Sequence, residues 1–173
     1  FRPHNDLFDN DEYWQKAFEV VDEVIGVCRP PRFFHVGMDE DHDRSYTQYV
    51  RAIFTLHAEL AARGLRPLIW NDSACDWPAA QIHVEKSLLA EEEIATDIVQ
   101  VPWNYWDVRP ETIDRLTARG FETWVAPGGN ADAVRAWRDA ALAHGAAGMV
   151  LTHWTPCNRA TRDTLLERIN TIG

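Results

Sequence analysis

The fold of this chain is decided by the stretch Phe33-Phe34-His35-Val36-Gly37-Met38-Asp39-Glu40. It follows Pro30-Pro31 and begins as a short apolar run, which is typical of a buried strand over residues 32–36. The run stops at a glycine and then presents two adjacent carboxylates. Ionisable groups at the carboxyl end of a strand carry the chemistry in α/β barrels, whereas an acidic run is more generally typical of a solvated loop.

Helical patterns and short apolar runs alternate along the rest of the chain. Apolar spacing and capping signals predict helices over residues 11–26, 45–64, 84–95, 110–119, 131–144 and 161–172. Apolar runs predict five strands over residues 32–36, 66–70, 98–101, 121–126 and 148–152. No repeat or linker interrupts this order, so we expect a single domain over residues 1–173.

The alternation of strands and helices indicates parallel strands joined by crossover helices. An open doubly wound sheet and part of a (β/α)8 TIM barrel both fit this pattern. A nucleotide-binding open sheet needs a glycine-rich phosphate loop after its first strand, and the loop after Gly37 offers acids instead. Polar and aromatic residues at successive strand ends favour the partial barrel.

Composition excludes some classes of partner. The net charge of −10 argues against nucleic acid and anionic membranes, which bind basic faces, and no apolar run approaches the length of a membrane span. The three cysteines are far apart and odd in number, so we expect reduced thiols and a cytoplasmic setting. The chain begins at Phe1, so we expect that an N-terminal portion, with any targeting signal, precedes it.

Tryptophan is the second informative feature, with eight in the chain. Indole faces stack on the C–H faces of sugars and carboxylates bind the hydroxyls, so this mixture predicts a carbohydrate ligand. Four tryptophans lie at or just beyond predicted strand ends: Trp70, Trp103, Trp106 and Trp154. Three others are expected in the core: Trp14, Trp124 and Trp137. Trp77 precedes Pro78 in a loop and stays unassigned.

The motif His35-x-Gly37-Met38-Asp39-Glu40 resembles the signature of family 20 glycoside hydrolases, the β-N-acetylhexosaminidases, at the end of barrel strand four. Later strand exits resemble that family in the same order: Trp70-Asn71-Asp72, Tyr105-Trp106-Asp107, Ala126-Pro127-Gly128-Gly129 and Thr152-His153-Trp154. The resemblance implies that the chain forms strands four to eight of a (β/α)8 TIM barrel.

The resemblance also implies substrate-assisted hydrolysis of a terminal β-linked N-acetylhexosaminide, with the acetamide oxygen of the substrate as nucleophile. Glu40 would be the general acid and base, and Asp39 would accept the acetamide N–H and stabilise the charge that develops there. Six residues are implied to bind the sugar: Trp70, Asp72, Tyr105, Trp106, Asp107 and Trp154. His35 would support the loop, and neither a cofactor nor a metal ion is expected.

Two departures from the family pattern weaken the implied sugar site. Asn130-Ala131 stands where a subgroup has an aromatic residue, and Pro156 stands where an acid is common. Strands one to three have no counterpart in the chain. We therefore expect the missing strands to come from a longer protein or a second chain, and the segment to be inactive alone.

Two readings from other classes remain open. One is a metal-dependent barrel hydrolase, in which His35, Asp39, His42 and Asp43 would ligate a divalent ion. The other is a non-catalytic carbohydrate-binding fragment, which the missing strands make plausible.

Overall fold

The computed structural model describes residues 10–156 and 158–172. In this part of the chain, strands and α-helices alternate as predicted. The strands are β1 (Phe33–His35), β2 (Arg66–Asn71), β3 (Val99–Pro102), β4 (Trp124–Val125) and β5 (Gly148–Met149). The α-helices are α1 (Asp11–Cys28), α2 (Tyr46–Ala62), α3 (Gln81–Ala90), α4 (Pro110–Ala118), α5 (Ala131–His144) and α6 (Arg162–Ile172).

Side-chain caps begin the first two helices. The side chain of Asn10 accepts the N–H of Tyr13 at 2.7 Å at the start of α1. Ser45 forms a capping box with Gln48 at the start of α2. α3 differs from its prediction: it begins at Gln81, straight after the 3₁₀ turn η3 (Pro78–Ala80), and ends at Ala90.

The strands pair in the order in which they occur in the chain. β1, β2 and β3 form one parallel sheet, and β4 and β5 form a second parallel pair. Two parallel bridges join the sheets, between Gln100 and Thr123 and between Trp103 and Ala126. The five strands therefore form one continuous parallel series.

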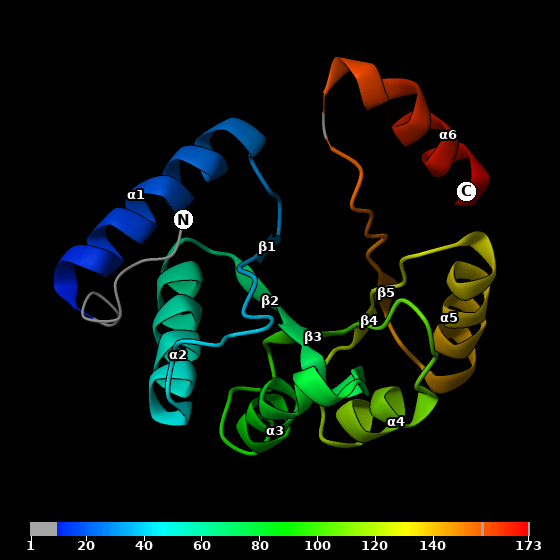
Figure 1. Ribbon diagram of the computed structural model, residues 1–173. Helices are drawn as coiled ribbons and strands as arrows, with labels where there is room; N and C mark the ends of the chain where they lie inside the picture. Colours follow the sequence, from blue (N-terminus) through cyan, green and yellow to red (C-terminus); the bar gives the residue numbers. More distant parts are fainter. Residues whose placement is uncertain (1–9, 157, 173) are drawn as a thin grey trace.

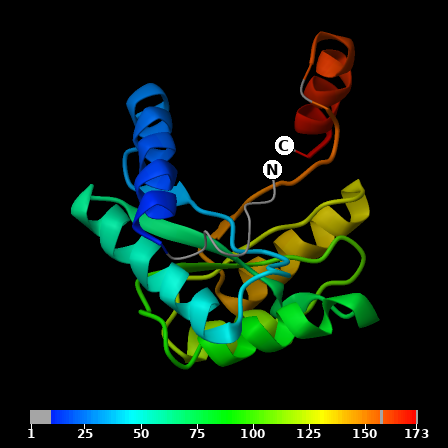
Figure 2. The ribbon, with the colours of Figure 1, turned by 60° about the vertical axis from the view of Figure 1, so that its left-hand side comes forward.

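This order separates the two predicted architectures. A doubly wound sheet reverses its strand order partway and carries helices on both faces, whereas right-handed crossovers in chain order place every connecting helix on the same face. Helices α2 to α5 follow one another around the outside of the strands (Figures 1 and 2). Within the described residues the outer edges of β1 and β5 have no neighbouring strand, so the arc is open. We propose that it is a segment of a (β/α)8 barrel.

Side chains of the central strands alternate between two apolar clusters. Ile69 packs outward with residues of α2 and α4, and Leu68 packs inward with Val99 and Val101. The inner face of the strands is covered in the middle of the arc. The inward residues are buried there because Trp77 and its loop fold over them.

Apolar side chains are exposed instead at the two ends of the arc. None of the described residues of α1 is buried, and Trp14, expected in the core, is only half-buried. On α6, the apolar side chains of Leu166 and Ile169 are exposed. In the described part of the chain, apolar side chains of α1 and α6 are therefore left uncovered. Trp137 on α5 is fully buried, as predicted.

Two smaller expectations concern cysteines and membranes. Cys28 and Cys75 carry free thiols, and Cys157 lies outside the described residues. None of the helices in the described ranges combines the length and apolarity that crossing a bilayer requires.

Residues 1–173 on their own should self-associate. The unpaired edges of β1 and β5 and the exposed Val20, Val24 and Val27 of α1 are surfaces that isolated monomers bury by association. Sedimentation at a series of concentrations should show a mass that rises with concentration. A monomer of constant mass that unfolds cooperatively would contradict the expectation.

Candidate active site

The acidic loop, residues 37–43, leaves β1 with an unusual backbone. Gly37, Met38 and Glu40 all have positive φ, at 80°, 79° and 45°. For residues with a Cβ this left-handed conformation costs about 1–2 kcal/mol each. Such conformations persist where the surroundings enforce them, and they concentrate at functional sites. The loop that the sequence singled out is therefore held in a strained form on either side of Asp39.

Asp72 supplies the contact that holds Glu40. It follows β2 in the 3₁₀ turn η2 (Asp72–Ala74), and its Oδ2 accepts the backbone N–H of Glu40 at 2.9 Å. Its Oδ1 accepts the indole N–H of Trp103, which follows β3, at 2.7 Å. One carboxylate thus ties together the exits of three successive strands.

The environment of Asp72 changes the role that the resemblance implied for it. Its residue is 2% exposed and both oxygens are engaged, so it lies behind the site as a support and away from any sugar hydroxyl. Burial raises the pKa of Asp72 to about 6, and the charges of Asp39 and Glu40 act in the same direction. The two N–H donors oppose this rise because they favour the ionised carboxylate.

His35 supports the same loop from the strand side, as predicted. Its Nδ1 accepts the N–H of Gly37 at 3.1 Å, and its ring lies 4.3 Å from that of Trp70. Burial lowers the pKa of His35 to about 4, so the imidazole is neutral near pH 7. A neutral ring with Nδ1 as acceptor suits a structural role.

The far end of the acidic loop is fixed to α3. Lys86 donates to the carbonyl oxygens of Asp41, at 2.6 Å, and Arg44, at 2.5 Å. The guanidinium of Arg44 in turn binds the carboxylate of Asp41 at 2.9 Å. The loop is therefore anchored on both sides of Glu40.

Asp39 and Glu40 face a cavity of about 470 Å³, a volume within the range of small-molecule sites. Six residues implied by the resemblance line it: Asp39, Glu40, Trp70, Tyr105, Trp106 and Trp154. Four others complete the lining: Trp77, Trp103, Thr152 and His153. Burial and the adjacent charge of Glu40 raise the pKa of Asp39.

An aromatic wall forms most of this cavity. The ring of Trp77 lies 5.4 Å from those of both Trp103 and Trp106, and Tyr105 lies 5.4 Å from Trp103. The indole N–H of Trp154, which follows β5, donates to the hydroxyl of Tyr105 at 3.3 Å. Trp106 and Trp154 are 71% and 86% exposed, so their faces are available to a ligand.

The structure places a few residues of the site differently from what the sequence indicated. Asp107 was implied to bind sugar, but its side chain is 64% exposed and does not line the cavity. Trp77, left unassigned, is central to the wall. The sequence contains a sign of this role. Trp77 lies in a polar loop after a strand, where no helical pattern predicts that its side chain packs in the core.

The metal-dependent alternative gains no support from the geometry. Among residues 10–156 and 158–172, no three His, Cys, Asp or Glu side chains lie close enough together to hold a metal ion. His35 instead packs on Trp70. The four residues considered as ligands therefore do not converge.

Gly128→Ala should disrupt the aromatic wall. A Cβ at Gly128 would lie 2.6 Å from Cε1 of Tyr105 and 3.0 Å from Oγ1 of Thr152, so the tyrosine ring must move. Such overpacking costs about 1–3 kcal/mol of unfolding free energy, measurable by chemical denaturation. Gly26→Ala is the control, because a Cβ there meets nothing within 4 Å. Equal effects of the two substitutions would contradict this account of the wall.

Comparisons with known proteins show a likeness in fold alone. No protein-family profile and no curated protein matches the sequence. Among solved structures, the chain is similar to that reported as "Crystal structure analysis of Dispersin B", with a TM-score of 0.58 and 16% sequence identity. The match covers 95% of this chain and 58% of that chain. At this identity the chain shares the fold of part of that structure, and the likeness extends no further.

Proposed function

We propose that this chain carries the active site of a glycoside hydrolase that removes terminal β-linked N-acetylhexosamine. The observation that carries the proposal is the placement of Asp39 and Glu40, on a left-handed loop, at a cavity walled by aromatic rings from later strand exits. The fold likeness to part of the Dispersin B structure supports the barrel segment on which this placement depends.

The shape and chemistry of the cavity suit a sugar. Sugar rings have apolar C–H faces that pack on indole, and Trp106 and four other tryptophans line the cavity. Carboxylates of the acidic loop face the same space and can accept hydrogen bonds from hydroxyl or amide groups. A phosphorylated ligand fits poorly, because the two carboxylates would repel it.

Glu40 is assigned the proton transfers. In the first step its carboxylic acid protonates the glycosidic oxygen while the acetamide carbonyl oxygen of the substrate attacks the anomeric carbon. The bond to the leaving group breaks and an oxazolinium ion forms. In the second step the Glu40 carboxylate takes a proton from water, whose oxygen adds to the anomeric carbon and reopens the ring with retained configuration.

Asp39 and Tyr105 are assigned to the acetamide group. Asp39 would accept the acetamide N–H and stabilise the positive charge of the oxazolinium ion. Tyr105 accepts a hydrogen bond from Trp154 and retains its own hydroxyl proton, which it can donate to the acetamide oxygen. The two residues would orient the nucleophile from opposite ends of the amide.

A sugar-binding protein without catalysis would use the same aromatic wall. The strained backbone beside Asp39 favours the enzyme, because binding by stacking alone gives no reason to hold adjacent acids in a left-handed loop. Turnover of an aryl N-acetyl-β-glucosaminide by a protein that contains these residues and a completed barrel separates the two functions.

Glu40→Gln should lose activity mainly on substrates with poor leaving groups. Protonation matters least when the leaving group is already acidic, so an aryl glycoside should retain far more of its kcat/KM than an alkyl glycoside. General acid catalysis contributes about 10²–10⁴-fold, which sets the expected loss on the alkyl substrate. Equal loss on both substrates would remove Glu40 from the role of acid.

Asp39→Asn should reduce kcat on both kinds of substrate alike. The asparagine keeps the size of the side chain but lacks the charge that stabilises the oxazolinium ion, and loss of one such interaction costs about 10²–10³ in kcat. Steady-state kinetics on the same aryl and alkyl glycosides test this. An Asp39→Asn protein with unimpaired turnover would exclude Asp39 from the mechanism.

A further inference from the structure

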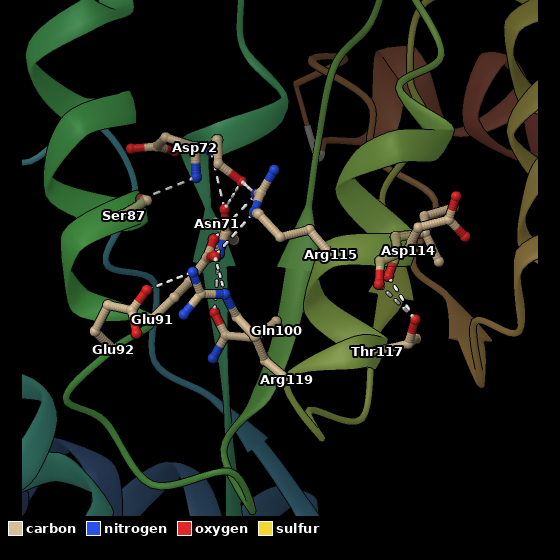
Figure 3. Close-up of polar contacts among 12 residues, drawn as sticks. Asn71, Asp72, Ser87, Glu91, Glu92, Gln100, Asp114, Arg115, Thr117 and Arg119 are labelled. Atoms are coloured by element: carbon tan, nitrogen blue, oxygen red, sulfur yellow. Dashed lines mark hydrogen bonds and ion pairs between the residues drawn. The ribbon is translucent and has the colours of Figure 1, made fainter.

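A buried ion pair lies on the helical side of β2, away from the cavity. The side chain of Glu91, just after α3, is 0% exposed and meets Arg115 of α4. Arg115 Nε donates to Oε2 of Glu91 at 3.0 Å and Nη2 donates to Oε1 at 3.1 Å (Figure 3). A carboxylate removed from water requires such pairing, so the position of one partner fixes the other.

Asn71 connects this ion pair to the end of β2. Its Nδ2 donates to Oε1 of Glu91 and to Oε1 of Gln100, each at 3.1 Å. Its Oδ1 accepts the N–H of Ser73 at 2.9 Å and also the Ser73 hydroxyl. Both ends of the amide are therefore engaged, and Asn71 is held in a single orientation (Figure 3).

Arg115 also reaches the turn directly. Its Nη2 donates to Oγ of Ser73 at 2.6 Å, so one guanidinium joins Glu91 to the residue after Asp72. The backbone N–H of Asp72 itself donates to Oγ of Ser87 on α3 at 3.1 Å. The turn around Asp72 is thus fixed from the helices, while its carboxylate reaches the other way toward the acidic loop.

We propose that Arg115 is a positioning residue that acts through Ser73 and Asp72 on the acidic loop. It braces the turn that presents the Asp72 carboxylate to the backbone of Glu40 and to the indole of Trp103. Its bearing on catalysis rests on the proposed function, whereas its effect on Asp72 does not.

The chain supplies a matched control in Arg119. This residue follows α4, and its Nε lies 3.6 Å from Oε2 of the same Glu91, while its Nη2 pairs with Glu92 at 2.5 Å. No hydrogen bond joins Arg119 to Ser73 within the described residues. Arg119→Met therefore weakens the charge pairing of Glu91 without cutting the link to the turn.

The test compares Ser73→Ala, Arg115→Met and Arg119→Met by hydrogen exchange of indole N–H groups in NMR spectra. Ser73→Ala is the sharper variant, because it keeps the Glu91–Arg115 pair and so remains informative if Arg115→Met does not fold. Exchange of the Trp103 indole N–H reports how firmly the Asp72 carboxylate keeps its hydrogen bond to that group. The indole of Trp137, buried and donating to the carbonyl oxygen of Asn104 at 2.9 Å, reports global opening in the same sample.

Exchange at Trp103 should accelerate by about tenfold relative to Trp137 in Ser73→Ala and Arg115→Met, the change expected for loss of one hydrogen-bonded brace. In Arg119→Met the ratio should match that of the unaltered protein. An unchanged ratio in Ser73→Ala, or parallel acceleration at both indoles, would overturn the proposal.

Kinetics in the completed protein separate this proposal from the proposed function. In an active enzyme, Ser73→Ala should lower kcat with little change in KM, because the aromatic wall still binds the sugar while the backbone of Glu40 loses its fixed position. A rise in KM with kcat unchanged would overturn the positioning role. An unaltered protein that hydrolyses no N-acetylhexosaminide would count against the proposed function alone, since the exchange comparison is independent of turnover.

Discussion

The carboxylate of Asp72 is the contact on which the site depends. It accepts the N–H of Glu40 and the indole N–H of Trp103, and so joins the loop after β1, the turn after β2 and the exit of β3. A buried carboxylate with two donors is stable only when both stay in place, because an unsatisfied buried charge is costly. The left-handed backbone at Glu40 and the buried indole at Trp103 are therefore two halves of one arrangement.

The winding of the strands explains why this arrangement can exist. Parallel strands paired in chain order bring each exit next to the following one, so residues about thirty positions apart in sequence meet at one edge. The carboxylates that line the cavity come from the first exit, and its aromatic rings come from the second, third and fifth. The helices outside the strands then determine how each exit is oriented, and the contact of Arg115 with Ser73 is one means by which they do so.

Much of the fold and most of the cavity lining could be predicted from the sequence, because both follow local patterns. α5 has the predicted bounds, and the acids and aromatics at strand exits converge as expected. The direction of a single polar side chain could not be predicted. Asp72 and Asp107 each lie close after a Trp at a strand exit, yet one is buried behind the wall and the other is largely exposed. The exposure of α1 could not be predicted either, because the burial of a helix depends on what lies beside it and not on its own apolar pattern.

The spacing of the contacts to Asp72 sets the order in which the site can form during synthesis. Trp103 follows Glu40 by 63 residues. At about 5–20 residues per second, the ribosome needs roughly 3 to 13 s to deliver the indole after the acid. During that interval a nascent chain carries Asp39 and Glu40 without one of the two donors that Asp72 requires. The strained loop is therefore a late product of translation, although its own residues are made early.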